Sequence, residues 1–226
     1  MAFWTAGAVG LMIAYLLGSI PTGYLAGKLL QGIDIREHGS MSTGATNVLR
    51  TLGKWPALAV LVIDVLKGAA AVLVARWFCP WLASQLSPTP PTAAELQVSV
   101  PWMVCLAGIA ALLGHGRSIW LNFAGGKSAA TGLGVVLAMS WPVGLGTAAV
   151  FGLVLAITRI VSLSSMLAAV TAIVLVFGLA HPLPYRLLVI AGGLYVIMRH
   201  RANIGRLLAG TEPRLGQSSP QLDSTP

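Results

Sequence analysis

Three stretches of the chain combine small residues with hydrogen-bond donors, and each adjoins a long apolar run. They are Gly39–Arg50, Gly114–Gly132 and Arg199–Glu212. Small residues let backbone N–H groups approach an anion, and hydroxyl, amide and guanidinium groups add donors. Irregular backbone at membrane depth is tolerated only where protein or water satisfies it. We therefore predict that the three stretches meet at one membrane face and bind phosphate.

The candidate binding residues are rich in cations and donors and poor in metal ligands. Beside the Gly125–Gly126 backbone they include Ser40, Thr46, Asn47, Arg50, Lys127, Ser162, His200, Asn203 and Arg206. The chain has only six acidic residues, and none of them forms a cluster with metal-ligand spacing. We therefore expect no metal in this site.

Gly125-Gly126-Lys127 resembles part of a phosphate loop, but the full Walker pattern needs a glycine where Leu121 stands. Glycines before an apolar helix can still favour an anion, because free N–H groups collect at a helix N-terminus. The alternative interpretation is a flexible turn with a lysine that reaches toward the membrane surface.

Two common acyl-transfer sites are missing from the sequence. No histidine is followed by aspartate five residues later, which excludes the base of acyl-CoA-dependent glycerolipid acyltransferases. No Gly-x-Ser-x-Gly elbow is present, so nothing indicates a serine acyl-enzyme.

The composition indicates an integral membrane protein. The 226 residues are 56% hydrophobic and 9% charged, against about 25% charged residues in soluble domains. We expect an all-α polytopic bundle at 1–210, which forms one catalytic domain, and a disordered tail at 211–226. The net charge of +8 favours anionic lipids or substrates, although many of these cations can simply set topology.

The first apolar run, Trp4–Gly27, is long enough to span a bilayer, and the first basic residues follow it. This charge distribution puts the N-terminus outside and Lys28–Lys54 in the cytoplasm. Trp55–Phe78 then returns outward. We expect Cys79–Pro101 to be an extracytoplasmic loop, because it has five prolines and no charge other than Glu95. Trp102–Leu113 comes back inward.

The uncharged run Ser128–Thr158 creates a problem of sidedness. As a single span it would leave the arginine-rich segment Arg199–Arg214 outside, against the charge rule. If a break at Trp141-Pro142 divides this run into two spans, with Gly144 and Gly146 easing the turn, Arg199–Arg214 lies in the cytoplasm. With the later spans Leu163–Ala180 and Leu187–Met198, this gives about seven spans and a cytoplasmic C-terminus. The break divides Ser128–Thr158 into two short helices. If these two helices form a re-entrant pair instead of two spans, the chain has five spans with the same sidedness.

Asp64 and Lys67 lie inside the second span, three residues apart and therefore on one helical face. Charges inside a membrane are candidates for function. We expect a mutually neutralising pair that ties this helix to the loops, and direct contact with substrate is the alternative.

The three motifs together resemble the acylphosphate-dependent glycerol-3-phosphate acyltransferase family, PlsY. The matching stretches extend from Gly18 to Glu212 and read GSIPTGYLAGKLLQGIDIREHGS, TGATNVLRTLGK with DVLKG, GHGRSIWLNFAGGKSAATGLG and HRANIGRLLAGTE. Two places depart from the usual family pattern. Met41, Ser42 and Thr43 replace a Gly-Asn-Ile segment, and Ala124 and Ser128 flank the Gly-Gly-Lys.

The resemblance implies acyl transfer from fatty acyl phosphate to the 1-hydroxyl of sn-glycerol 3-phosphate, giving lysophosphatidic acid and inorganic phosphate. It implies no metal, coenzyme A or nucleic acid, a multi-pass location in the plasma (inner) membrane, and an active site facing the cytoplasm. By matching motif positions, the glycerol-3-phosphate ligands are Ser40, Arg50, Lys127, His200 and Asn203. Those of the acyl phosphate are Thr46, Asn47, Gly125, Gly126 and Ser162.

Of these residues, we expect Arg50, Lys127, His200 and Asn203 to be catalytic. The hydroxyl proton would pass to a substrate phosphate oxygen, with His200 as the alternative base. A second hypothesis is a transporter or flippase of a phosphate ester, which would need polar residues through both leaflets. The parts of the chain expected in the outer leaflet carry almost no charge, which argues against this hypothesis.

Overall fold

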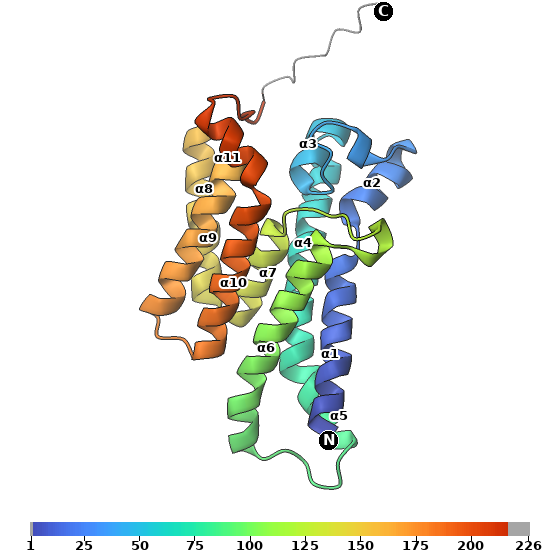
Figure 1. The fold of residues 1–226 in the computed structure, drawn as a ribbon, viewed down its shortest axis with the longest axis vertical. Helices are drawn as coiled ribbons and strands as arrows, with labels where there is room; N and C mark the ends of the chain where they lie inside the picture. Colours follow the sequence, from blue (N-terminus) through green and yellow to red (C-terminus); the bar gives the residue numbers. More distant parts are fainter. Residues whose placement is uncertain (1, 217–226) are drawn as a thin grey trace, which may run out of the picture.

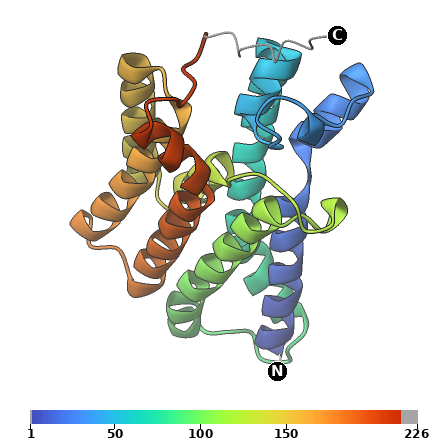
Figure 2. The ribbon, with the colours of Figure 1, turned by 45° about the horizontal axis from the view of Figure 1, so that its top comes forward.

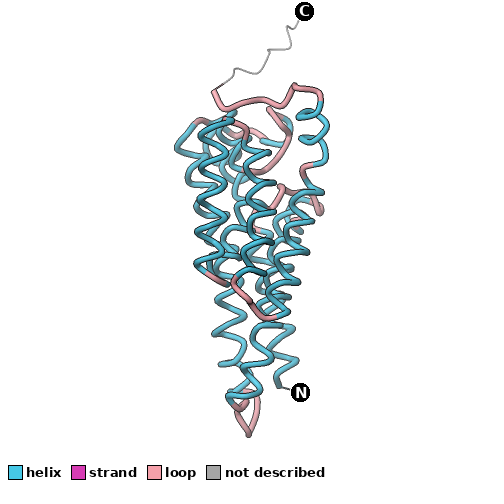
Figure 3. Tube along the Cα trace, turned by 90° about the vertical axis from the view of Figure 1, so that its left-hand side faces the viewer, coloured by secondary structure: helices cyan, strands magenta, loops and turns pink. Residues whose placement is uncertain are grey.

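A computed structural model describes residues 2–216, which form a bundle of helices with no β-strand among them (Figure 1). The all-α prediction is therefore confirmed. The long helices run roughly along the length of the molecule (Figure 3). In chain order the elements are α1 (Ala2–Ser19), α2 (Thr22–Gln31), η1 (Ile35–Glu37), α3 (Ala45–Leu52), α4 (Lys54–Leu73), η2 (Val74–Phe78), α5 (Cys79–Gln85), α6 (Ala93–Gly116), η3 (Ile119–Leu121), α7 (Ala129–Met139), α8 (Trp141–Thr158), α9 (Val161–Gly178), α10 (Leu183–Arg199) and α11 (Arg201–Leu208).

Four helical segments of the described residues are long and apolar enough to cross a membrane. These are Lys54–Gln85, Ala93–Gly116, Trp141–Thr158 and Val161–Gly178. The bent pair α1 and α2 is a fifth if it counts as one span, and α7 is a shorter apolar helix. The chain is thus a multi-pass membrane protein, while seven spans and the orientation of the termini stay predictions.

The first apolar run is not one helix, contrary to the prediction for Trp4–Gly27. α1 ends at Ser19, and α2 leaves at an angle of 40°. Pro21 explains the break, because proline lacks an N–H group and disfavours helical backbone at the residue before it. At the break the Ile20 carbonyl has no partner from the next helical turn, and among the described residues it accepts only the Thr22 N–H from the backbone, at 3.0 Å.

The prediction of a loop over Cys79–Pro101 was wrong. The second long helix continues through a π-helical turn into α5, and α6 already begins at Ala93. A capping box starts α6 early: Glu95 N–H donates to Thr92 Oγ1, and Thr92 N–H donates to the Glu95 carboxylate. The prolines that suggested a loop are partly accommodated in helices, since Pro80 lies in the first turn of α5 and Pro101 inside α6.

The predicted break near Trp141-Pro142 is confirmed to within one residue. Ser140 is extended and separates α7 from α8, with Pro142 in the first turn of α8. The expected role of the glycines was wrong, because Gly144 and Gly146 lie inside α8. A Cβ atom on Gly144 would lie 2.6 Å from the Cα of Leu137. Gly144 therefore permits close packing of α8 against α7 and is not part of the turn between these helices.

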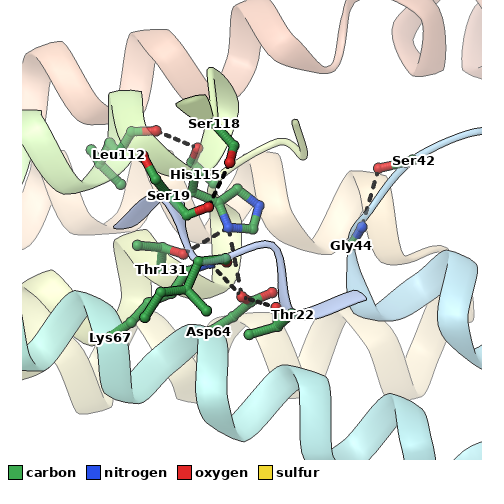
Figure 4. A network of polar contacts seen from close by, with 12 residues as sticks. Ser19, Thr22, Ser42, Gly44, Asp64, Lys67, Leu112, His115, Ser118 and Thr131 are labelled. Carbon is green, nitrogen blue, oxygen red and sulfur yellow. Dashed lines mark hydrogen bonds and ion pairs between the residues drawn. The ribbon is translucent and has the colours of Figure 1, made fainter. Parts of the chain in front are cut away.

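The predicted ion pair of Asp64 and Lys67 exists and is fully buried, with 2.8 Å between Oδ1 and Nζ. Figure 4 shows what surrounds it. The Thr22 hydroxyl donates to Asp64 at 2.6 Å, and Lys67 donates to the carbonyl of Ile20 at 2.8 Å. His115 Nδ1 lies 3.6 Å from the Asp64 carboxylate. The pair therefore joins α4 to the break between α1 and α2 and to the end of α6.

Replacing Lys67 by methionine should leave the buried Asp64 carboxylate without its cation. We expect a loss of about 3–5 kcal/mol in the free energy of unfolding, the usual cost of an uncompensated buried charge. The double variant Asp64→Asn/Lys67→Met should lose clearly less. Chemical unfolding in mixed micelles measures both, and a Lys67→Met variant as stable as the native protein would contradict this account.

Candidate active site

A cavity of about 480 Å³ lies between α3, α4 and α7 on one side and α9, α10 and α11 on the other. Figure 2 brings this end of the bundle forward, with α3 (cyan) and α11 (red) separated from each other there. Eight of the ten predicted ligands line the cavity: Ser40, Thr46, Asn47, Arg50, Lys127, Ser162, His200 and Asn203. The other two, Gly125 and Gly126, do not belong to its lining.

Three helices begin at this cavity. Its lining includes the first residues of α3, α7 and α9, and none of these helices has a side chain that caps its N-terminus. The first N–H groups of a helix have no partner within it and carry a partial positive charge. Together with Arg50 and Lys127, these helix ends make the cavity suitable for negatively charged ligands.

The Lys127 ammonium is held in the cavity by a hydrogen-bonded chain of side chains. Lys127 Nζ donates to Asn203 Oδ1 at 2.7 Å, and Asn203 Nδ2 donates to Glu212 Oε1 at 2.5 Å. An ammonium group can only donate and a carboxylate can only accept. The two partners therefore fix which way the Asn203 amide points.

Glu212 is a site residue that the sequence interpretation missed. Its carboxylate also accepts hydrogen bonds from Ser162 Oγ and Arg206 Nε, both at 2.7 Å. The segment that carries it returns to the bundle, where Leu215 N–H donates to the Arg159 carbonyl at 2.7 Å. A domain boundary at residue 210 leaves this residue out. Of the tail predicted at 211–226, residues 217–226 lie outside the described part of the chain.

The surroundings shift the proton affinities of the charged groups in the cavity. Burial lowers the pKa of Lys127, an effect that Glu212 opposes and that Arg206, Arg50 and Arg199 reinforce. Burial alone would raise the pKa of Glu212, but hydrogen bonds from Ser162, Asn203 and Arg206 outweigh it and lower the value. Glu212 is thus an anion at neutral pH and supports the positive charge of Lys127.

His200 has one ring nitrogen committed to the backbone. Nδ1 lies 2.7 Å from the carbonyl oxygen of Val196, which can only accept, so Nδ1 carries the hydrogen. Burial lowers the pKa of His200, against the opposing effect of the Val196 carbonyl. The ring is therefore neutral near pH 7, with an unprotonated Nε2 that can accept a hydrogen bond.

The side chain of Asn47 is used by its own loop. Nδ2 lies within 3.0 Å of three carbonyl oxygens, those of Ile35, His38 and Ser42, and Oδ1 accepts from the Ser40 N–H at 2.7 Å. An amide nitrogen has only two hydrogens to give. Asn47 therefore braces the backbone around Ser40, and its amide offers no further hydrogen to a ligand.

Gly125 and Gly126 are glycines for a steric reason. A Cβ atom would lie 2.2 Å from the His115 carbonyl oxygen at Gly125 and 2.2 Å from His115 Nε2 at Gly126. The Gly126 N–H donates to that same carbonyl at 3.1 Å. The Gly126 N–H is thus bonded within the protein, and the two glycines bring the chain close to α6 just before Lys127.

Away from its charged end, the cavity continues between apolar helices. Its lining there is mostly small and aliphatic residues of α4, α7, α9 and α10, with Phe151 from α8, and it also includes Asp64, His115 and Thr147. A ligand with a polar head and an apolar chain fits this division. Within residues 2–216, no three His, Cys, Asp or Glu side chains are grouped as metal ligands.

Replacing Gly126 by alanine should force the Lys127 segment away from His115. We expect at least about a tenfold loss of turnover, because small displacements of positioning groups are costly in catalysis. Gly152→Ala is the matched control, since a Cβ atom there meets nothing within 4 Å. Steady-state kinetics test both variants, and equal activity in the two would refute the steric explanation.

A family model described as glycerol-3-phosphate acyltransferase matches residues 8–210. Curated relatives carry the same description. One from Rhizobium johnstonii, glycerol-3-phosphate acyltransferase 2, is 76% identical over 96% of this chain and 99% of its own length. Another, from Acaryochloris marina, is 57% identical over 96% of both chains.

Two solved structures share the fold. Both are crystal structures of PlsY, an integral membrane glycerol 3-phosphate acyltransferase, in its glycerol 3-phosphate form and its lysophosphatidic acid form. The first has a TM-score of 0.81 and 36% identity over 93% of this chain and 96% of that one. The second has a TM-score of 0.78 and 35% identity over 93% and 95%.

Proposed function

The chain belongs to the glycerol-3-phosphate acyltransferase family, and we propose that its acyl donor is a fatty acyl phosphate. The acceptor is then the 1-hydroxyl of sn-glycerol 3-phosphate, and the products are lysophosphatidic acid and inorganic phosphate. The observation that carries this proposal is that cations and uncapped helix N-termini adjoin an apolar region within one cavity. Such a cavity suits two phosphates, one of which bears an acyl chain.

For the glycerol 3-phosphate we propose contacts with Ser40, Arg50, Lys127, His200 and Asn203. Arg50 lies on α3, and Lys127 and Asn203 are bonded to each other across the cavity. Cations from two sides offset the repulsion that two phosphates exert in a site of low dielectric. The neutral His200 ring, with Nε2 unprotonated, suits contact with the glycerol hydroxyl.

For the acyl phosphate we propose contacts with Thr46 and Ser162, near the N-termini of α3 and α9. Asn47, Gly125 and Gly126, which we first predicted as direct ligands, would act by holding the backbone around Ser40 and Lys127. Ser162 has one hydroxyl hydrogen, which it now gives to Glu212. Binding of the acyl phosphate would therefore require that hydrogen to turn toward the ligand.

The reaction needs orientation and charge stabilisation more than it needs an enzyme nucleophile. The glycerol 1-oxygen attacks the carbonyl carbon of the mixed anhydride, the bond from that carbon to the phosphate oxygen breaks, and phosphate departs. The hydroxyl proton passes to a phosphate oxygen of a substrate. Helix N-termini and Lys127 would stabilise the charge that develops on the carbonyl oxygen and on the leaving phosphate.

We place the active site on the cytoplasmic face of the plasma (inner) membrane. The basis is the distribution of basic residues, since Lys28, Arg50, Lys127 and the arginines after α10 all belong to segments at the α3 and α11 end of the bundle. Both substrates are anions, and the net charge of +8 favours their approach.

Purified protein incubated with fatty acyl phosphate and glycerol 3-phosphate should release inorganic phosphate and form lysophosphatidic acid. Lys127→Ala and Arg50→Ala should each reduce turnover by at least about a hundredfold, since they remove charge stabilisation at the reacting groups. Lys54→Ala is the control, an exposed cation outside the cavity lining. Absence of phosphate release by the native protein would contradict the proposed donor. Turnover by the double variant Arg50→Ala/Lys127→Ala would contradict the assignment of these two residues to the active site.

The identity of the base is tested by His200→Gln. A general base contributes about 10²–10⁴-fold, so a loss below about tenfold is expected if a substrate phosphate takes the proton. Because the pKa of His200 is lowered from 6.5, a His200 base would make the native rate fall as pH drops through that lowered value. A large loss of rate together with disappearance of that acid limb in the variant would make His200 the base.

A further inference from the structure

Arg199, the last residue of α10, reaches across to the segment that precedes Lys127. Its Nη2 donates to the carbonyl oxygens of Gly125 and Gly126, both at 2.9 Å, and its Nε donates to Gly126 at 3.2 Å. In the described part of the chain no carboxylate forms an ion pair with Arg199. The guanidinium therefore binds two consecutive backbone carbonyls. Its planar arrangement of N–H groups suits this geometry, which a lysine ammonium group could not reproduce.

The loop between α6 and α7 requires such support because its backbone is unusual. Asn122, Phe123 and Ser128 have positive φ angles of 53°, 59° and 62°, which L-residues rarely adopt. The first part of the loop closes on itself, since Ser118 N–H donates to the Ala124 carbonyl and Phe123 N–H to the Ser118 carbonyl. These bonds end at residue 124, so residues 125–127 depend on other elements for support.

Residues 125–127 are held from two sides by other elements. On one side the Gly126 N–H donates to the His115 carbonyl of α6. On the other side the three hydrogen bonds from Arg199 tie the same peptide units to α10. Without Arg199, the backbone of residues 125–127 would retain only the bond to His115 among those that the described residues show.

We propose that Arg199 is a positioning residue, which clamps the Gly125 and Gly126 carbonyls so that Lys127 enters the cavity opposite Asn203. The inference rests on the proposed role of Lys127 as a phosphate ligand. Arg199 immediately precedes His200, so the clamp also fixes the distance between the two halves of the site. Arg199 itself is absent from the cavity lining, and it acts through Lys127 rather than on substrate.

The clamp has an electrostatic consequence that can be measured. Lys127 faces Glu212, which supports its charge, and the cations Arg206, Arg50 and Arg199, which oppose it, with the His200 ring also nearby. Removing the charge of Arg199 should therefore raise the pKa of Lys127. If charged Lys127 is required for turnover, the alkaline fall in rate should move to higher pH in Arg199→Gln and stay in place in Arg199→Lys.

Kinetics of the full chain with two variants and a control test the clamp. Arg199→Lys keeps the charge and loses the fork, Arg199→Gln loses both, and Arg201→Gln changes an exposed arginine outside the cavity lining. Both Arg199 variants should lose at least about tenfold in kcat/KM for glycerol 3-phosphate, with the alkaline limb shifted only in Arg199→Gln. Arg201→Gln should stay within about twofold of native, like most surface changes.

Hydrogen exchange separates this inference from the proposed function, because it does not depend on activity. The Gly126 amide should exchange faster in both Arg199 variants than in Arg201→Gln, with α6 protection unchanged. Full rescue of kcat/KM by Arg199→Lys would show that charge alone matters and would overturn the clamp, as would unchanged exchange at Gly126. If the native protein releases no phosphate, the proposed donor fails while exchange still tests the clamp.

Discussion

The proposed site depends on one constraint: the charge of a lysine in a partly buried cavity has to be held and compensated there. The chain of hydrogen bonds from Lys127 through Asn203 to Glu212 meets this constraint with residues from three separate segments. Because Glu212 also accepts from Ser162 and Arg206, one carboxylate joins donors from α9 and α11, and Asn203 links it to Lys127 of the α6–α7 loop. Loss of any link would leave either an unpaired charge or an amide free to turn.

Broken helices supply the second part of the design. α7 ends at Met139 and α8 starts at Trp141, so an apolar run that could have been one helix becomes two, and the first begins at the cavity. The break at Pro21 likewise exposes the Ile20 carbonyl to Lys67. In both places interrupted backbone lies within the protein and finds partners, as a membrane environment requires.

The sequence predicts the parts of this arrangement that have a spacing or composition signal. The i,i+3 spacing of Asp64 and Lys67 predicted their ion pair. The break beside Pro142 was predicted because all arginine-rich segments had to lie on one side of the membrane. Glu212 could not be found in this way, because a lone acid among arginines has no characteristic spacing and its partners come from distant segments. The bracing role of Asn47 was equally hidden, since residue type alone does not say whether an amide is free. The helices within 79–101 were missed because prolines usually indicate a loop. Here Pro80 lies in the first turn of α5 and Pro101 lies inside α6, where helices accommodate them.

Labelling of introduced cysteines tests most directly whether the segments share one cavity. Ser40→Cys and Ser162→Cys, each with the native buried cysteines Cys79 and Cys105 replaced by alanine, would be exposed to a membrane-impermeant thiol reagent in sealed vesicles of one orientation. The account predicts that both react from the same side and that glycerol 3-phosphate slows both reactions. Reaction from opposite sides of the membrane would show that no common cavity exists.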